Sequence, residues 1–263
     1  MKIHHLNCGS VRAIDAPGLP AAPAVNHCLL AETADGLVLV ETGLGLADVR
    51  DPGGTLGDDW VAMAQPHLAE EETAVRQLAR LGFAPSDVRH VVVTHLDVDH
   101  CGGLPDFPAA TVHVLAAELD AAVAEAPSFR YRPAHWAHGP KWATYAAPAA
   151  DDWFGFASAP LTGVAADIRL VPLGGHTAGH AGVAVHDGTR WLLHCGDAYY
   201  FHRELDVEPQ PHPVLDVVQT RSEIHHDLRL GTQARLRELV RRHGDEVTVF
   251  SAHDPWELAR LRG

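Results

Sequence analysis

The chain has 263 residues, of which 46% are hydrophobic and 21% charged, so it can bury a sizeable core and is not expected to be disordered. Its formal net charge of -14, with Lys2 and Lys141 as the only lysines, argues against a nucleic-acid partner, which needs clustered basic residues. No apolar run is long enough to cross a bilayer, and the first residues are too polar for a secretory signal, so we expect a cytoplasmic protein without a membrane partner.

Strands and helices alternate in the first half of the chain. Asp35-Gly36 is a turn signal between two apolar segments and predicts a β-hairpin. Apolar side chains at helical spacing, followed by Gly82, predict an amphipathic helix over residues 70–81. The predicted strands of this half are 26–32, 37–40, 88–94 and 111–115, and a second helix is predicted at 116–124.

Periodicity fails between residues 127 and 163, a Pro-punctuated segment that holds much of the chain's aromatic content. We predict that this aromatic-rich insert is a lid, a wall of the substrate pocket or a subunit contact, and the last alternative leaves a homodimer open. Simple packing of an irregular insert explains the pattern equally well. The candidate pocket residues from this insert are Phe129, Tyr131, His135, Trp136, His138 and Trp142.

The second half repeats the alternation of strands and helices. Strands are predicted at 168–172, 182–186, 191–194 and 247–250. A long helix is predicted from about residue 222 to 243, and a short one after Pro255. Because both element types recur in both halves without a low-complexity linker, we expect an α/β fold in a single domain of residues 1–263.

The segment that follows the strand at 88–94 carries four side chains able to bind metal: His95, Asp97, Asp99 and His100. Imidazole is the commonest protein ligand for zinc and related metals, and the chain has 20 histidines. Side chains two apart point the same way in extended backbone, so His95 and Asp97 could reach one metal while Asp99 and His100 reach a second. Taken alone, the segment is equally well a solvated acidic loop with Asp99 capping a helix.

Three later segments also place His or Asp directly after an apolar strand. They carry His176 with His180, Asp197, and His253. Any one of them could be an ordinary strand end, but parallel or mixed sheets gather such ends at one edge, where binding sites are commonly built. Together with residues 95–100 they therefore indicate a metal site at one edge of the sheets.

Taken in order, these segments resemble the metallo-β-lactamase-fold hydrolases, and within them the branch of the N-acyl-homoserine lactonases and similar lactone or ester hydrolases. The resemblance covers nearly the whole chain, because it begins at Glu41-Thr42-Gly43 and runs through residues 95–103, 175–180, 196–197 and 251–254. It implies a four-layer αββα sandwich with the metal site at one edge of the two sheets.

The resemblance also implies two divalent metal ions, zinc before iron or manganese. One ion would be held by His95, Asp97 and His176 and the other by Asp99, His100 and His253. Asp197 would bridge the two ions, and His180 would lie next to the ligands. Tyr200 matches the family's tyrosine that contacts the substrate carbonyl, and Tyr199 is its rival and a further candidate pocket residue.

The family usually has histidine where this chain has Asp97, and a carboxylate there favours iron or manganese relative to imidazole. A di-iron redox or oxygen-using protein of the same fold is therefore the main alternative, and a non-catalytic, metal-stabilised binding module is the other. The favoured function is a dinuclear hydrolase of a small lactone or carboxylic ester. A metal-bridging hydroxide would attack the carbonyl, Tyr200 would stabilise the oxyanion and Asp99 would protonate the leaving oxygen.

Overall fold

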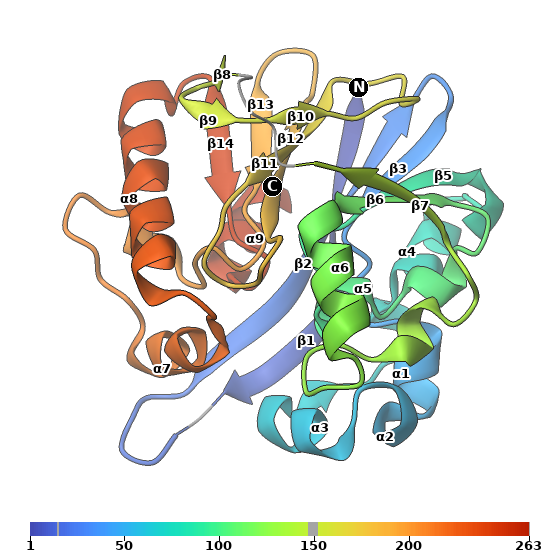
Figure 1. The fold of residues 1–263 in the computed structure, drawn as a ribbon, viewed down its shortest axis with the longest axis horizontal. Helices are drawn as coiled ribbons and strands as arrows, with labels where there is room; N and C mark the ends of the chain where they lie inside the picture. Colours follow the sequence, from blue (N-terminus) through green and yellow to red (C-terminus); the bar gives the residue numbers. More distant parts are fainter. Residues whose placement is uncertain (15, 147–151, 263) are drawn as a thin grey trace.

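Two β-sheets lie against each other with helices on the outer face of each, as Figure 1 shows for the computed structural model. The structure describes residues 1–14, 16–146 and 152–262. The predicted four-layer sandwich of helices, sheet, sheet and helices is confirmed. No helix in these described ranges is both long and apolar enough to cross a membrane.

The first sheet has seven strands in the order β4-β1-β2-β3-β5-β6-β7, and the second has five in the order β10-β11-β12-β13-β14. The strands of the first sheet are β1 (Lys2–Ile14), β2 (Ala22–Thr33), β3 (Gly36–Val40), β4 (Pro66–His67), β5 (Val88–Val92), β6 (Thr111–Leu115) and β7 (Lys141–Tyr145). Those of the second are β10 (Ala159–Pro160), β11 (Ile168–Pro172), β12 (Ala181–His186), β13 (Trp191–His194) and β14 (Val247–Phe250), beside a small pair of β8 (Asp152–Trp153) and β9 (Phe156–Ala157).

Helices join these strands and cover the sheets. In the first half they are α1 (Leu46–Arg50), α2 (Pro52–Thr55), α3 (Asp58–Ala64), α4 (Ala74–Arg80), α5 (Val98–Cys101) and α6 (Ala116–Glu125). In the second half they are α7 (Pro213–Ser222), α8 (His226–His243) and α9 (Pro255–Arg262).

Successive side chains of a central strand enter different layers of the core. In β3, Leu37 and Leu39 pack with Leu78 of α4 on the helix side of the first sheet. Val38 and Val40 point the other way and pack against the second sheet, where they meet Val183 of β12. Burial of each such side chain stabilises the fold by about 1.5–3 kcal/mol. Because alternate side chains of β3 enter the two cores, this burial stabilises the packing of the first sheet against both its helices and the second sheet.

Strand direction brings several chain segments to one edge of the sandwich. β3 pairs in parallel with β5, and β13 pairs in parallel with β14, so the carboxyl ends within each pair share an edge. Glu41 directly follows β3, residues 95–100 follow β5, Asp197 follows β13 and His253 follows β14. The topology therefore places these segments close together at one edge of the sandwich.

Two predicted helices differ from the observed ones at their first turns. The helix predicted over 70–81 begins with a 3-10 turn at Glu70–Glu72, and extended backbone at Thr73 separates that turn from α4. The helix predicted from about 222 to 243 begins later, at His226, because Glu223 is extended and the His225 side chain accepts a hydrogen bond from the Leu228 amide. Residue 222 instead ends α7, a helix that the sequence analysis did not predict.

The aromatic-rich insert is more regular than expected. It contains β7, which pairs in parallel with β6 from Thr111 opposite Lys141 to Leu115 opposite Tyr145. This edge strand is only half-buried, so it lacks the continuous apolar run by which the central strands were recognised. Residues 147–151 of the insert lie outside the described ranges.

Candidate metal centre

The seven candidate ligands come together at the edge of the sandwich, although their positions span more than half of the sequence. They form three groups in which the potential ligand atoms all lie within 4.8 Å of one another. The groups are His95 with Asp97 and His176, His95 with His100 and Asp197, and Asp99 with His100 and His253.

Asp197 stands between two sets of imidazoles. Its Oδ1 lies 3.1 Å from Nε2 of His100 and 3.1 Å from Nε2 of His253. Its Oδ2 lies 3.4 Å from Nε2 of His176 and 4.0 Å from Nε2 of His95, and also 3.3 Å from Nε2 of His253. When four nitrogen or oxygen ligands surround zinc in a tetrahedron at about 2.0–2.2 Å, neighbouring ligand atoms are about 3.3–3.6 Å apart. The distances between Asp197 and the imidazoles are close to this value, so they suit one cation on each side of the carboxylate.

The histidines are turned so that Nε2 faces the centre. His253 Nδ1 donates to the Val25 carbonyl at 2.9 Å, and His100 Nδ1 contacts the Glu41 carboxylate. The buried Nε2 atoms of His95 and His100 have no hydrogen-bond partner among the described residues. An unpaired buried polar atom costs about 1–3 kcal/mol, and a divalent cation would satisfy all of these atoms together. The mixture of imidazole and carboxylate donors fits zinc or a related metal.

Two buried glutamates hold the ligand segments, and neither was assigned a role from the sequence. Glu41 has a φ of 61° and aims its carboxylate at His100. The Glu118 carboxylate accepts hydrogen bonds from the Leu96 amide at 3.0 Å, the Thr177 hydroxyl at 2.6 Å and the Gly179 amide at 3.0 Å. Glu118 therefore links the segment of His95 to that of His176, and burial raises the pKa of its carboxyl. A glutamate in the first turn of a helix looks exposed in sequence, so no signal marked it.

His180 lies beside the ligands, and the backbone uses both of its ring nitrogens. Nδ1 donates to the Leu173 carbonyl at 2.7 Å, and Nε2 accepts from the Asp197 amide at 3.0 Å. Burial lowers the pKa of His180 to about 3, so the ring is neutral. Gly196, with a φ of 52°, allows this approach, because a Cβ there would lie 2.6 Å from His180 Nε2.

A cavity of about 360 Å³ opens onto the cluster. Five of the candidate ligands line it: Asp97, Asp99, His176, Asp197 and His253. The rest of its wall is largely apolar and comes from β1, α3 and α7, with Val11, Ile14, Trp60, Met63, Val214, Leu215 and Val218. Arg130 and Arg221 add positive charge to the wall. The cavity thus pairs the polar cluster with space for an apolar group.

The two candidate tyrosines lie in different places. The Tyr200 hydroxyl lines the cavity and donates to Asp197 Oδ2 at 2.8 Å, and burial raises its pKa, so it keeps its proton at neutral pH. Tyr199 points away, and its hydroxyl donates to the Glu257 carboxylate at 3.0 Å. The prediction of Tyr199 as a pocket residue is therefore wrong, because the two side chains leave the backbone on opposite sides.

Most of the aromatic-rich insert lies away from this cavity as well. Phe129 lines it as predicted, but the other five insert residues proposed for the pocket do not. The Tyr131 hydroxyl donates to Glu118, and His135 Nε2 lies 2.9 Å from Asp48. Those five predictions are corrected, because these side chains do not line the cavity: Tyr131 and His135 bond buried carboxylates beside it, and Trp142 lies in β7 at the edge of the first sheet. The five are Tyr131, His135, Trp136, His138 and Trp142.

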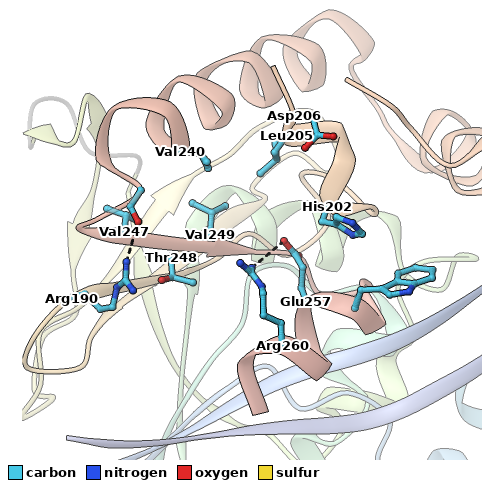
Figure 2. A pocket seen from close by; sticks show the side chains of 12 residues that line it. Arg190, His202, Leu205, Asp206, Val240, Val247, Thr248, Val249, Glu257 and Arg260 are labelled. Atoms are coloured by element: carbon cyan, nitrogen blue, oxygen red, sulfur yellow. Dashed lines mark hydrogen bonds and ion pairs between the residues drawn. The ribbon is translucent and has the colours of Figure 1, made fainter. Parts of the chain in front are cut away.

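A second cavity, of about 470 Å³, lies between β14, α8 and α9 (Figure 2). Val247 and Val249 form its apolar floor, and the Glu257 and Arg260 side chains at its rim are 3.9 Å apart. None of the seven candidate ligands lines it. The chemistry of the lining side chains therefore favours the cavity beside the cluster as the candidate site.

Comparison with known proteins gives a consistent result. Residues 22–248 match the Metallo-beta-lactamase superfamily. A probable metallo-hydrolase of Mycobacterium tuberculosis is 44% identical over 99% of this chain and 83% of its own length, and an N-acyl homoserine lactonase of Bacillus thuringiensis is 33% identical over 36% and 38%. The fold is similar to that of an N-acyl homoserine lactone hydrolase solved with N-hexanoyl-L-homoserine at its catalytic metal centre, with a TM-score of 0.74 and 21% identity over 98% of this chain and 95% of that one.

Proposed function

The chain belongs to the metallo-beta-lactamase superfamily and is a metallo-hydrolase, and from this premise we propose that it binds two divalent ions and cleaves a small lactone or carboxylic ester. The seven candidate ligands would hold the ions as the sequence motifs imply. His95, Asp97 and His176 would bind one ion, Asp99, His100 and His253 the other, and Asp197 both.

The main support for this proposal is the position of Asp197. Its Oδ1 lies 3.1 Å from Nε2 of His100 and of His253, and its Oδ2 lies 3.4 Å from Nε2 of His176 and 3.3 Å from that of His253, so the carboxylate reaches both ligand sets. A structural carboxylate at a strand end needs only one partner, whereas a carboxylate that shares its oxygens between two ligand sets is suited to bridge two cations. Divalent ions bound there would supply Lewis acidity and a hydroxide nucleophile, by lowering the pKa of water to about 7.

The side chains around the cluster would stabilise the oxyanion, protonate the leaving oxygen and position the ligand segments. Tyr200 keeps its proton and lies beside the carboxylate that both ligand sets share, so its hydroxyl can donate to the oxyanion that develops on the substrate carbonyl. Asp99 lines the same cavity and can deliver a proton to the leaving oxygen. Glu41 and Glu118 keep the ligand segments in place, which limits the rearrangement that the reaction requires.

The cavity supports a substrate that joins a carbonyl to an apolar arm. The polar cluster forms one end, and apolar side chains of β1, α3 and α7 form the rest of the wall. The lactone-hydrolysing relatives of the same superfamily favour a lactone or ester bond over the thioester and phosphotriester alternatives. Zinc is the proposed metal, because the Arg130 guanidinium pairs with Asp97 and offsets the extra negative charge that would favour iron.

The test is hydrolysis by metal-free protein reconstituted with zinc, manganese or iron, assayed on lactones, aryl esters, thioesters and phosphotriesters. We expect the zinc form to turn over lactones or carboxylic esters fastest. An iron form that consumes oxygen without hydrolysing any of these substrates would support the di-iron alternative instead. Full activity in a variant with His100→Ala and Asp197→Asn together would refute the cluster as the reactive site.

A further inference from the structure

Arg130 contacts the cluster on the side of Asp97 and His176. Its Nη1 donates to both oxygens of Asp97, at 3.0 and 2.8 Å, and lies 3.3 Å from Nε2 of His176. Its Nη2 donates to the Ser222 carbonyl at the end of α7. The side chain is only 16% exposed, so this guanidinium is a fixed part of the site rather than a surface charge.

The turn that carries Arg130 is itself well anchored. The Ser128 amide donates to the Tyr131 carbonyl at 2.9 Å, and the Tyr131 amide donates to the Ser128 hydroxyl at 3.1 Å. The Tyr131 hydroxyl then reaches Glu118, which holds the segments of both His95 and His176. The guanidinium therefore keeps its place beside Asp97 through contacts that do not depend on the carboxylate.

The two halves of the cluster differ in charge as a result. The half built from His95, Asp97 and His176 has Asp97 and the shared Asp197 as carboxylates, and the guanidinium contacts it directly. The half built from Asp99, His100 and His253 has Asp99 and the same Asp197. A third carboxylate, Glu41, contacts its His100, and no lysine or arginine side chain among the described residues does so.

Other charged groups nearby do not cancel this difference. Glu118 contacts backbone amides of the ligand segments rather than ligand side chains, and four donors surround its carboxylate. Arg221 lines the cavity beyond the cluster. A divalent ion is attracted by neighbouring carboxylates and repelled by a guanidinium, and this effect is strong in a buried site.

We propose that the two halves bind metal with unequal affinity and in a fixed order, and that Arg130 sets this order. The half with Asp99, His100 and His253 takes the first ion, and the half paired with Arg130 takes the second ion more weakly. This inference rests on the proposed two-ion cluster but not on the identity of the substrate.

Zinc titration of metal-free protein against a chromophoric chelator tests the proposal. The wild-type protein should bind two ions, with dissociation constants that differ by roughly tenfold or more. Arg130→Gln should tighten the weaker step by a similar factor and leave the tighter step within about threefold, because the repulsion acts on the near half of the cluster. Arg130→Lys keeps the positive charge and should stay close to the wild type.

Arg132→Gln is the matched control, because Arg132 lies on the same turn but bonds the Leu56 carbonyl and Asp59 away from the cluster. It should leave both steps unchanged. Thermal melting of each metal-free variant checks that the fold is intact. The order itself is tested by His253→Ala, which should remove the tighter step, and by His176→Ala, which should remove the weaker one.

Two wild-type ions of equal affinity would overturn the proposal, and so would a weaker step that loosens in Arg130→Gln. Loss of the tighter step in His176→Ala would reverse the order and overturn it as well. A wild-type protein that binds no zinc would have a different meaning, because it would refute the metal centre of the proposed function itself.

Discussion

At the scale of single residues, two adjacent tyrosines have different surroundings, and this separates their roles. Tyr200 reaches Asp197 within the cavity, whereas Tyr199 is fully buried against Glu257. The sequence offered only spacing to choose between them, and spacing cannot tell which side of the backbone each ring takes in an irregular segment. The hydrogen bonds distinguish the two rings: Tyr200 bonds Asp197 three residues earlier in the same segment, whereas Tyr199 bonds Glu257 of α9.

The pair gives a matched test of the oxyanion contact. Tyr200→Phe should lower kcat by about a hundredfold or more, because it removes one donor to the developing oxyanion. Tyr199→Phe should leave kcat within a few-fold and lower only stability, since its hydroxyl bonds Glu257 alone. Steady-state kinetics of both variants on the preferred ester or lactone measure whether the Tyr200 hydroxyl contributes to catalysis. Equal losses of kcat in the two variants would remove Tyr200 from the proposed mechanism.

Residues that support the candidate ligands were harder to predict than the clustering of those candidates at one edge. The seven candidate side chains and their strand-end positions are visible in sequence because His and Asp follow apolar strands there. Glu118 and Arg130 become recognisable only when the chain has folded, since their partners are the backbone of residue 96, Thr177 and Asp97. A charged residue on a turn or a helix end is usually solvated, and its sequence neighbours do not show otherwise.

At the scale of elements, strands with a continuous apolar run were predictable, whereas β7, which has no such run, was not. β6, β11, β13 and β14 have the bounds expected from their apolar runs, because these strands are buried on both faces. β7 was missed, because an edge strand with Lys141 and Thr144 exposed shows no such run. Strands with buried side chains on both faces were therefore predicted more accurately than the half-buried edge strand β7.

The last helix, α9, carries a second element-scale feature. Glu257 lies in its first turns, where its carboxylate accepts from the Ser251 amide at 2.7 Å and from the Tyr199 hydroxyl at 3.0 Å. Burial, with a smaller contribution from Asp254, raises the pKa of Glu257 from 4.5 to about 8. The side chain therefore joins α9 to the end of β14 while carrying a proton at neutral pH.

This raised pKa makes stability depend on pH. Between about 4.5 and 8 the folded chain holds a proton on Glu257 that the unfolded chain has released, so the free energy of unfolding falls as the pH rises through this range. One such proton corresponds to at most about 1.4 kcal/mol per pH unit. Glu257→Gln cannot ionise, and its stability relative to the wild type should therefore increase from pH 5 to pH 8 and then level off.

Urea denaturation of both proteins across this range measures the effect. The informative quantity is the difference in the free energy of unfolding between the two proteins at each pH. The many histidines of the chain also titrate between pH 5 and pH 8, and they affect both proteins alike. A difference between the two proteins that stays constant with pH would show that Glu257 keeps its ordinary pKa in the folded chain.

At the scale of the whole molecule, the cluster joins the two sheets at an edge where core packing and a few hydrogen bonds also hold them together. The ligand segments follow β5 of the first sheet and β11, β13 and β14 of the second. Each proposed ion would bind the segment after β5 together with two segments of the second sheet, and would therefore cross-link the two sheets at one edge. Bound metal should therefore stabilise the entire sandwich rather than one loop.

Removal of metal tests this coupling. A ligand present at about a thousand times its dissociation constant stabilises the folded state by about 4 kcal/mol, and each kcal/mol shifts Tm by about 2–4 °C in a chain of this size. We therefore expect a chelator to lower Tm by roughly 8 °C or more and added zinc to restore it. Asp197→Asn should show a clearly smaller difference between the two conditions. An identical Tm with and without zinc in the wild type would contradict the coupling.

The most direct test of the account is the position of zinc in crystals of the reconstituted protein, measured by anomalous scattering at the zinc edge. We expect two peaks, one on each side of Asp197, each about 2.0–2.2 Å from the assigned imidazole and carboxylate atoms. A peak away from these side chains, or no peak near Asp197, would contradict it.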